Sequence, residues 1–466
     1  MPTYQESFSA YSAAQAQAQA YPKDPVAAFN VGWWGAKLGK FSDAIAAYEQ
    51  SIALGLSGPE EAMVNIASIY SERLGDAAAA LEWLGRALET DPLYYPALFN
   101  RAHLAEQLGD RDTAVEYFAR ASKVKADDPL ALTRLVEAMP MLRTDDPHIA
   151  KLRHIATKSS DADVFYALAK VEERLGQYSN AWRALQAANA CDAKAHSPWQ
   201  QDVAETRYRS LLSQPLPPLV QRAGQTDNAP VFIVGMFRTG STLLEQLLAA
   251  HSRFFPLGES EFWPRAIAQL GGSMIVPTKP IKSEEAERLR NGFYAHMSDR
   301  QVPVNRRVTD KRPDNLYHLP MIAKALPEAR FIITERDWRD TLLSVWATRL
   351  HPQHAYATNL ANIRAQLQVC KSLSDHWRAN HPDRVYRFRY EDLMANPEVT
   401  MRALLDWLGE PWDPDCLSFH RLQNPVRTAS VWQIREPLMQ TRQQRWVRYE
   451  AQLRQELGTA LDQEMP

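Results

Sequence analysis

The stretch VFIVGMFRTGSTLLEQLL, residues 231–248, decides the fold because it predicts a buried strand, a tight loop and a helix in succession. Gly235 and Gly240 have the spacing of a Walker A loop, in which a lysine and a Ser or Thr follow the second glycine. Here Ser and Thr follow directly, the lysine is missing, and the cation of the loop, Arg238, precedes the second glycine. We therefore expect a phosphate-binding loop for a nucleotide whose reactive end is not a triphosphate.

The hydrogen-bond donors of this loop follow from the same residues. Backbone N–H groups of Arg238 to Thr242 are expected to converge on a phosphate, helped by the dipole of the following helix. The hydroxyl groups of Ser241 and Thr242 and the guanidinium of Arg238 would add charge-assisted hydrogen bonds. The competing interpretation is a glycine-containing turn between strand and helix that binds no ligand.

Length and composition limit the class of protein. A chain of 466 residues suggests roughly two to four domains. The net charge of -2 predicts no general basic surface, which disfavours nucleic acid as a partner. Three scattered cysteines fit a reducing compartment rather than a disulfide framework or a zinc cluster. The N-terminus lacks the features of a secretory signal, and no apolar run approaches the roughly 18 residues of a membrane span. We therefore expect a cytoplasmic protein without a membrane span.

An internal repeat occupies much of the first half of the chain. Four fragments align on a glycine, which is followed by a small residue and then by a bulky one on the same helical face. The glycines are Gly39, Gly75, Gly109 and Gly176, the small residues are Ala44, Ala80, Ala114 and Ala181, and the bulky residues are Tyr48, Leu84, Phe118 and Leu185. We expect each glycine to end a helix and each alanine to let the next helix approach it closely.

This pattern resembles the tetratricopeptide repeat, a helix–turn–helix unit of about 34 residues. The resemblance covers about Asp24 to Ala190, with a degenerate unit between Asp127 and Ser160. It implies a helical solenoid with a concave binding surface. An unrelated helical bundle is the alternative.

The pattern changes after a segment rich in proline and polar residues. Short β-rich runs, VFIVG, RRVTD, ARFIITER and RVYRFRY, alternate there with helical segments, which favours a parallel sheet with flanking helices. We therefore predict an N-terminal extension (1–23), a helical repeat domain (24–213), a linker (214–229) and an α/β domain with a P-loop-like parallel sheet (230–466).

A second motif follows the run ARFIITER. Arg336 stands at the carboxyl edge of the predicted strand, where ligands bind in doubly wound sheets, and Ser344 follows on the next predicted helix. An arginine and a serine in these places are suited to clamp a second phosphate. The alternative is a surface arginine paired with Asp337 or Asp340.

Together the two motifs resemble the cytosolic and Golgi sulfotransferases, which use 3′-phosphoadenosine 5′-phosphosulfate (PAPS) as donor. The family motif for the 5′-phosphosulfate is matched position by position by Arg238, Thr239, Gly240, Ser241 and Thr242. Arg336 and Ser344 match the motif for the 3′-phosphate. The resemblance spans nearly all of residues 230–449, and the similar members include the tyrosylprotein sulfotransferases. It implies a nucleotide-binding transferase that requires no metal ion.

Sulfuryl transfer needs a group that accepts the proton of the acceptor hydroxyl. Glu259 has the distance from the loop arginine at which the tyrosylprotein enzymes carry their catalytic glutamate, so the resemblance implies Glu259 as the base. If Gly258 and Glu259 are instead aligned with the first two residues of the Gly-Glu-Glu element of those enzymes, Ser260 stands at the position of the base. Glu261 is the reserve candidate. A helix cap or an arginine partner is the structural alternative for Glu259.

The resemblance also implies further site residues. Lys311 matches a family lysine beside the bridging oxygen of the donor, where a cation stabilises charge that develops on the leaving phosphate. Ser430 aligns with a family serine near the transferred group, and Tyr390 is placed near the nucleotide, with packing at a strand end as its alternative. For His251 and His318 we expect helix-end or packing positions.

The sequence thus predicts a PAPS-dependent sulfotransferase that releases 3′-phosphoadenosine 5′-phosphate (PAP). The acceptor hydroxyl is left open among a peptide tyrosine, a glycan and a small molecule. The repeats would hold a peptide or protein acceptor, form a homodimer or support the catalytic domain. Phe254, Phe255, Phe262 and Trp263 are expected either to wall an acceptor pocket or to pack in the core. The rival functions are an ATP-dependent kinase, which the missing Walker lysine disfavours, and a non-catalytic repeat scaffold.

Overall fold

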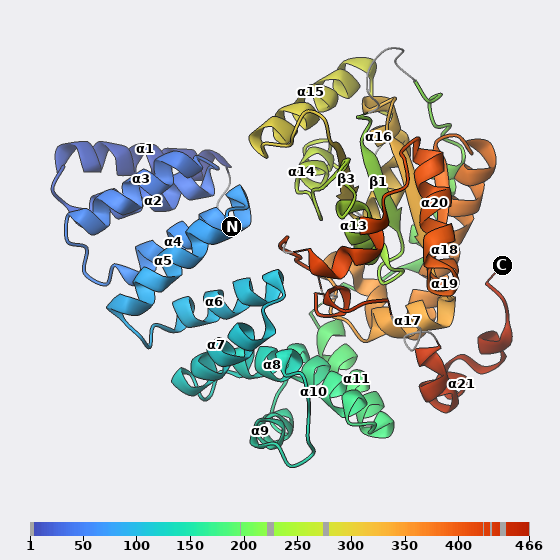
Figure 1. The fold of residues 1–466 in the computed structure, drawn as a ribbon, viewed down its shortest axis with the longest axis horizontal. Coiled ribbons are helices and arrows are strands. Elements are labelled where there is room, and N and C mark those ends of the chain that lie inside the picture. The colour runs from blue at the N-terminus through green and yellow to red at the C-terminus, as the bar shows by residue number, and fades with distance from the viewer. Residues whose placement is uncertain are drawn as a thin grey trace. The chain divides into compact units, whose positions relative to one another are not determined.

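The computed structural model describes residues 4–195, 197–220, 228–273, 279–422, 424–428, 431–438 and 444–465 (Figure 1). The chain forms two compact units, of which the first comprises Met1–Leu152 and Gln423–Val426 and the second Arg153–Leu422 and Arg427–Pro466. These compact units are defined by contacts, whereas the domain limits given above come from patterns in the sequence. Those limits therefore remain a prediction.

Helices in antiparallel pairs form the repeat region. They are α1 (Tyr4–Ala20), α2 (Pro25–Lys37), α3 (Phe41–Ala53), α4 (Glu60–Ile69), α5 (Ala77–Thr90), α6 (Tyr95–Leu108), α7 (Arg111–Val124), α8 (Pro129–Ala138), α9 (Pro147–Ala156), α10 (Ala162–Arg174) and α11 (Tyr178–Ala193), with a π-helical turn η1 (Tyr70–Leu74) after α4. Helices α8 and α9 lie within the range that the sequence predicted as a degenerate unit. The Ala/Gln-rich N-terminus is helical, and Tyr11 of α1 is buried.

The repeat pattern is confirmed at every aligned position. The four glycines have φ between 75° and 82°, the left-handed conformation that ends a helix. All four alanines are completely buried, and the bulky residues that share their helical face are at most 2% exposed. An alanine lets the neighbouring helix approach, and the bulky residue fills the space beside it. The N-terminal region is therefore a helical solenoid of tetratricopeptide type.

A five-stranded parallel sheet forms the centre of the second unit. The strands are β1 (Val231–Gly235), β2 (Phe254–Pro256), β3 (Arg307–Lys311), β4 (Arg330–Glu335) and β5 (Val385–Arg389), and their order is β2-β3-β1-β4-β5. Four of them coincide with the β-rich runs of the sequence. Strand β2 was missed because its three residues, FFP, are too few to show a pattern.

Helices surround this sheet. They are α12 (Gln201–Leu212), α13 (Ser241–Ala249), α14 (Phe262–Gln269), α15 (Ser283–Asp299), α16 (Leu319–Ala325), α17 (Trp338–Trp346), α18 (Leu360–Asn380), α19 (Tyr390–Ala395), α20 (Pro397–Leu408) and α21 (Glu450–Leu457). Short 3₁₀ helices are η2 (Pro313–His318), η3 (Pro352–Thr358), η4 (Pro414–Arg421), η5 (Gln433–Arg435), η7 (Arg445–Tyr449) and η8 (Gly458–Asp462). Trp263 of α14 and Phe293 of α15 pack on Phe232 of β1, with ring centroids 5.9 and 6.1 Å away.

The strand register places the predicted site residues at one edge of the sheet. Ile233 of β1 pairs with Lys311, the last residue of β3, and Gly235 pairs with Thr334 near the end of β4. The carboxyl ends of β3, β1 and β4 therefore lie next to one another, where ligands bind in sheets of this topology. Among the described helices, none is both long and apolar enough to cross a lipid bilayer.

Candidate anion and acceptor site

The loop after β1 depends on two glycines that no other residue can replace without movement. Gly235 has φ 138°, and a Cβ atom there would lie 2.7 Å from the carbonyl oxygen of Thr334. Gly240 has φ 96°, and a Cβ atom there would lie 2.9 Å from the Tyr390 ring. The loop therefore packs closely against β4 and α19, and it leads directly into the first turn of α13. The N–H groups of that turn lack partners within the helix and are available to an anion.

Arg238 projects from this loop toward α17 and meets other cations. Its Nε atom donates to the Ser344 hydroxyl at 3.1 Å, which joins the two phosphate motifs of the sequence directly. Burial lowers the pKa of Arg238, and the charges of Arg445 and Arg336 lower it further, to about 10. Cations that are gathered in this way disfavour one another, so the cluster is suited to an anion that lies between them.

The second predicted arginine is held from two sides. Arg336 Nη2 donates to Asp340 at 3.2 Å, and its guanidinium lies 4.6 Å from the centroid of the Tyr390 ring. The side chain is 14% exposed, so the predicted surface ion pair exists but is largely buried. Tyr390 therefore contacts both Gly240 and Arg336, and links the two motifs at the predicted nucleotide site.

Arg445 was missed by sequence reasoning. It lies in η7, within the C-terminal stretch that resembles the sulfotransferases, but an arginine in an irregular segment carries no local signal of its role. Its Nε atom donates to Glu173 of α10 at 2.6 Å, and its Nη2 atom donates to the other carboxylate oxygen of Glu173. Only the tertiary structure brings this side chain to the loop arginine.

Lys311 and Glu259, the predicted catalytic pair, contact each other. Lys311 Nζ donates to Glu259 Oε1 at 2.6 Å, and the lysine side chain is 1% exposed whereas that of the glutamate is 40% exposed. Glu261 points to Arg312 and Arg265 at 3.9 and 3.8 Å and is 60% exposed. The structural alternative for Glu259 was a helix cap or an ion pair with an arginine. Glu259 does pair with a cation, but the cation is Lys311. The residue before α14 is Glu261, so Glu259 does not cap that helix.

Three buried carboxyl groups surround this pair, and none was predicted as a site residue. Glu245 of α13 accepts from Gly258 N at 3.0 Å and thereby fixes the backbone next to Glu259. Burial raises the pKa of Glu245 to about 7, that of Asp310 to about 8 and that of Asp314 to about 7, despite nearby cations. Acids with such pKa values exchange protons near neutral pH, and they are recognisable only once their burial is known.

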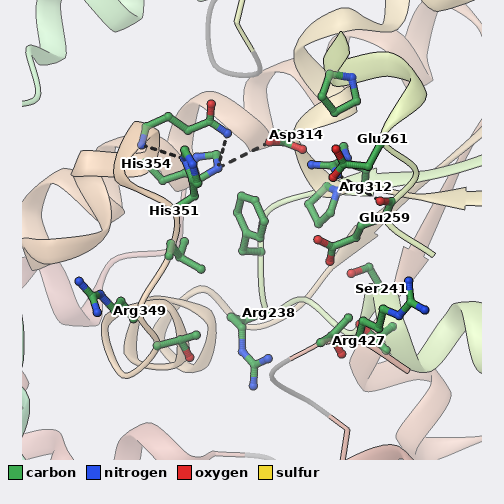
Figure 2. A pocket seen from close by; sticks show the side chains of 18 residues that line it. Arg238, Ser241, Glu259, Glu261, Arg312, Asp314, Arg349, His351, His354 and Arg427 are labelled. Atoms are coloured by element: carbon green, nitrogen blue, oxygen red, sulfur yellow. Dashed lines mark hydrogen bonds and ion pairs between the residues drawn. The ribbon is translucent and has the colours of Figure 1, made fainter. Parts of the chain in front are cut away.

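A cavity of about 510 Å³ opens beside the loop, and of these three carboxyl groups Asp314 lines it (Figure 2). Arg238, Ser241, Thr242, Glu259 and Glu261 line it. Its remaining lining residues are Phe237, Pro264, Arg312, Pro313, Asp314, Thr348, Arg349, Leu350, His351, Gln353, His354, Arg427 and Thr428. Four of these side chains are apolar and the others are polar or charged, so the cavity offers a ligand both hydrogen-bonding groups and apolar surface.

A buried His–Asp pair, His354 and Asp314, also lines this cavity (Figure 2). His354 Nε2 is 3.6 Å from Asp314 Oδ2, and both side chains are at most 4% exposed. Burial lowers the pKa of His354, and His351 and Arg312 lower it further, to about 3. His354 is therefore neutral, so its contact with Asp314 is not an ion pair.

Several predicted residues have other positions. The Thr239 hydroxyl contacts the Met236 carbonyl and the Thr334 hydroxyl, each at 2.7 Å, so this side chain braces the loop. Ser430 lies outside the described residues. His251 follows α13 and is buried: its Nδ1 accepts from the Arg253 N–H at 3.1 Å, and its Nε2 donates to the Pro411 carbonyl at 2.9 Å.

The predicted aromatic wall is wrong for this cavity. Its lining does not include Phe254, Phe255, Phe262 or Trp263, which pack instead in or against the core of the second unit. The described part of the chain also contains no group of three or more His, Cys, Asp or Glu side chains placed to hold a metal ion.

Comparisons with known proteins agree with this architecture. Residues 230–414 match the model of the sulfotransferase family, and residues 60–92 and 95–128 match that of the tetratricopeptide repeat. An uncharacterized protein of Aquifex aeolicus is 27% identical over 399 residues, which cover 80% of this chain and 51% of that protein. Protein-tyrosine sulfotransferase 1 of Danio rerio is 25% identical over 257 residues, which cover 49% of this chain and 69% of the enzyme.

One solved structure among the similar ones is the sulfotransferase domain of the Synechococcus PCC 7002 olefin synthase. It aligns with a TM-score of 0.37 and 16% identity, over 49% of this chain and 90% of that domain. The chain spans about half the length of the Aquifex protein, whereas it covers most of the tyrosine sulfotransferase. Residues 230–414 thus match the sulfotransferase family, and stretches that match the tetratricopeptide repeat precede them.

Proposed function

We propose that this protein transfers a sulfuryl group from PAPS to an acceptor hydroxyl group. The observation that carries the proposal is the meeting of Arg238, Arg336 and Ser344 at the carboxyl ends of β1 and β4. A nucleotide with phosphates at two positions needs cations that approach from two directions. The loop and the start of α17 supply them, beside a helix N-terminus that favours anions.

The residues of the site fit such a donor. The lowered pKa of Arg238 reports cations that are close together in a poorly solvated place, and a phosphate would offset their repulsion. Arg238 with the N–H groups of Ser241 and Thr242 would hold the 5′-phosphate, and Arg336 with Ser344 the 3′-phosphate. Tyr390, which already contacts Gly240 and Arg336, would border the nucleotide.

Glu259 and Lys311 would act on different oxygen atoms, Glu259 on that of the acceptor hydroxyl and Lys311 on that of the leaving phosphate. Glu259 lines the cavity and would take the proton of the acceptor hydroxyl as the new oxygen–sulfur bond forms. Lys311 would stabilise the charge that develops on the oxygen of the leaving phosphate as the old sulfur–oxygen bond breaks. Their contact at 2.6 Å supports Glu259 over Glu261 as the base, because only Glu259 lies at that cation.

The acceptor would occupy the polar cavity on the far side of Glu259. The Danio rerio relative is named for protein tyrosine, and a tyrosine, a sugar and a small alcohol all present a hydroxyl group. The repeats would hold an extended peptide or protein acceptor. The predicted homodimer has no support among the comparisons and stays a prediction.

Nucleotide binding tests the proposal. We expect the full-length protein to bind PAP, measured by isothermal titration calorimetry, and to bind it without magnesium. Arg238→Gln should weaken this binding about 10- to 100-fold, because it removes charge-assisted hydrogen bonds. A protein that binds ATP–magnesium and ignores PAP would be a kinase, and one that binds neither would be a scaffold.

The transfer itself needs an acceptor mixture. The protein should move radiolabelled sulfate from PAPS into a component of a fractionated cell extract, and the labelled product would identify the acceptor. Glu259→Gln is the matched variant, since it keeps the size of the side chain and removes the base. Equal labelling by this variant would exclude Glu259 from proton transfer.

A further inference from the structure

Glu245 is a buried carboxylate that the proposed mechanism does not use, although its helix begins at the phosphate loop. It lies one helical turn after Ser241, the first residue of α13, so the two side chains share one face of that helix. The N–H groups of the first turn would bind the donor phosphate. Glu245 is 3% exposed, and burial of a carboxylate costs free energy unless the group is hydrogen-bonded or paired.

The hydrogen-bond partners of Glu245 lie on the two segments that present the proposed catalytic pair. Its Oε1 atom accepts from Gly258 N at 3.0 Å and from the Thr309 hydroxyl at 3.3 Å. Gly258 directly precedes Glu259, the proposed base. Thr309 lies two residues before Lys311 in β3, so these two side chains are on the same face of the sheet. One carboxylate oxygen therefore contacts both segments.

The backbone before Glu259 is also held from the side of the sheet. Lys311 N donates to the Gly258 carbonyl at 2.9 Å, which extends the pairing of β2 with β3 beyond the strand. Arg312 Nη2 donates to the Glu259 carbonyl at 3.2 Å. Gly258 has φ 65°, so the chain turns at this residue. Glu259 thus follows a turn whose N–H group is fixed by α13 and whose carbonyl group is fixed by β3.

Charge couples Glu245 to the same pair. Burial raises the pKa of Glu245 to about 7, although Lys311 and the Gly258 N–H group lower it, and the charge of Glu259 raises it further. The charge of Glu245 in turn raises the pKa of Asp310 in β3. Lys311 therefore interacts with two carboxylates, of which Glu259 is in direct contact at 2.6 Å. An amide at position 245 would accept the same hydrogen bonds without the cost of a buried charge.

We propose that Glu245 is a positioning residue of the transfer reaction, which holds the backbone that carries Glu259 and stabilises the ammonium group of Lys311. One helix would then place the donor with its first turn and the base with its second. The described lining of the cavity does not include Glu245, so it acts through Gly258 and Lys311 rather than on a substrate. This inference rests on the proposed function, because that function assigns Glu259 and Lys311 to the transfer.

Hydrogen exchange of the full-length protein, followed by mass spectrometry on peptides that contain Gly258, tests the contact without an acceptor. Glu245→Ala should speed exchange of the Gly258 N–H group about tenfold or more, whereas Glu245→Gln keeps an acceptor oxygen and should leave it within about threefold of the wild type. Glu172→Ala is the matched control, because Glu172 is also 3% exposed but pairs with Arg153 in another part of the second unit. Unchanged exchange in Glu245→Ala would overturn the inference.

Sulfate transfer into the labelled component of the cell extract tests the positioning role. Glu245→Ala should lower the transfer rate about 10- to 100-fold and leave the Kd of PAP within about threefold of the wild type, because the base is misplaced while the donor site persists. Glu172→Ala should transfer like the wild type at equal folded fractions. Wild-type transfer by Glu245→Ala would overturn the inference while the proposed function stands. Absence of transfer by the wild type would overturn the proposed function instead.

The pH profile separates the charge of Glu245 from its hydrogen bonds. The ratio of the wild-type rate to that of Glu245→Gln should rise from less than about 2 at pH 6 to about 5–10 at pH 8, since the carboxyl group is mostly protonated at pH 6 and mostly ionised at pH 8. Asp310 and Asp314 titrate in both proteins, so the ratio isolates Glu245. A ratio that does not change with pH would overturn the role of its charge.

Discussion

The two compact units bury different kinds of side chain. The helices of the first unit meet through alanines and bulky apolar residues, such as Ala114 and Phe118, which are completely buried. The second unit also has an apolar core, but at the edge of its sheet it buries Lys311, Asp310 and Asp314. Apolar burial stabilises a fold, whereas burial of charge costs free energy and shifts pKa values. The sheet edge of the second unit therefore contains buried ionisable groups with shifted pKa values, beside an apolar core of the kind that the first unit also has.

Glycine shows the same contrast. Gly75 in the repeats and Gly240 in the loop both have positive φ, but a Cβ atom at Gly75 would meet nothing within 4 Å. At Gly240 it would meet the Tyr390 ring at 2.9 Å. The repeat glycine is needed for the conformation alone, and the loop glycine also for the close approach of neighbouring chain.

The largest effect should be the loss of stability caused by a substitution that opens a cavity in the core of the repeats. Phe118→Ala is expected to destabilise the first unit by about 3–5 kcal/mol, because the cavity that forms beside Phe99 cannot close fully. Calorimetric unfolding would measure the loss, and PAP binding should be unchanged. Glu116→Ala, on the same helix with a side chain 62% exposed, is the control and should have little effect. Weakened PAP binding by Phe118→Ala would show that the first unit supports the nucleotide site.

Removal of the buried cation should affect turnover and spare binding. Lys311→Ala is expected to lower sulfate transfer about 100- to 1,000-fold, as does the loss of one preorganised donor to developing charge, with the Kd of PAP within about threefold of the wild type. Lys371→Ala, which removes a lysine of α18 that pairs with Asp375, is the control. Unchanged transfer would remove Lys311 from the mechanism.

The buried acids should make stability depend on pH. The folded state holds the proton of Asp310 up to a pKa of about 8, whereas the unfolded chain releases it near the ordinary pKa of an aspartate, 3.8. Between these values the folded state binds more protons, so stability should fall as the pH rises, by about 1.4 kcal/mol per pH unit for one such group.

Denaturant unfolding of Asp310→Asn at pH 5, 6 and 7 would measure this slope. The amide mimics the protonated carboxyl group, so the variant should lose less stability over the range than the wild type. Asp314 and Glu245 remain and should keep part of the slope. Parallel profiles for the two proteins would contradict a raised pKa at Asp310.

The smallest expected effect is the difference between alanine substitutions at Gly75 and at Gly240. Gly75→Ala should cost about 1 kcal/mol of stability, from the left-handed conformation alone, and leave PAP binding unchanged. Gly240→Ala should weaken PAP binding about tenfold in addition, because the Tyr390 ring must move. Binding measurements on both variants, at equal folded fractions, would separate conformation from close approach. Equal binding by the two would show that the loop tolerates the displacement.

Sequence reasoning succeeded where the signal is local. The repeat glycines, alanines and bulky residues recur at regular positions, and four of the five strands coincide with β-rich runs of sufficient length. The loop residues 238–242 and the pair Arg336–Ser344 are likewise close in sequence to the strands that present them. Strand β2 and the burial of Glu245, Asp310 and Asp314 carry no such signal, because a carboxylate in sequence looks the same whether buried or exposed.

The sequence by itself determined the two fold types, since periodicity follows from helix and strand geometry, and it predicted the residues of both phosphate motifs, whose role stays a prediction. Only the tertiary structure joined those motifs through the contact between Arg238 and Ser344, and brought Arg445 and Glu173 to them from distant parts of the chain. Packing of non-adjacent segments sets such contacts, and it also sets the burial that shifts the pKa values. Neither can be obtained from the spacing of residues along the chain.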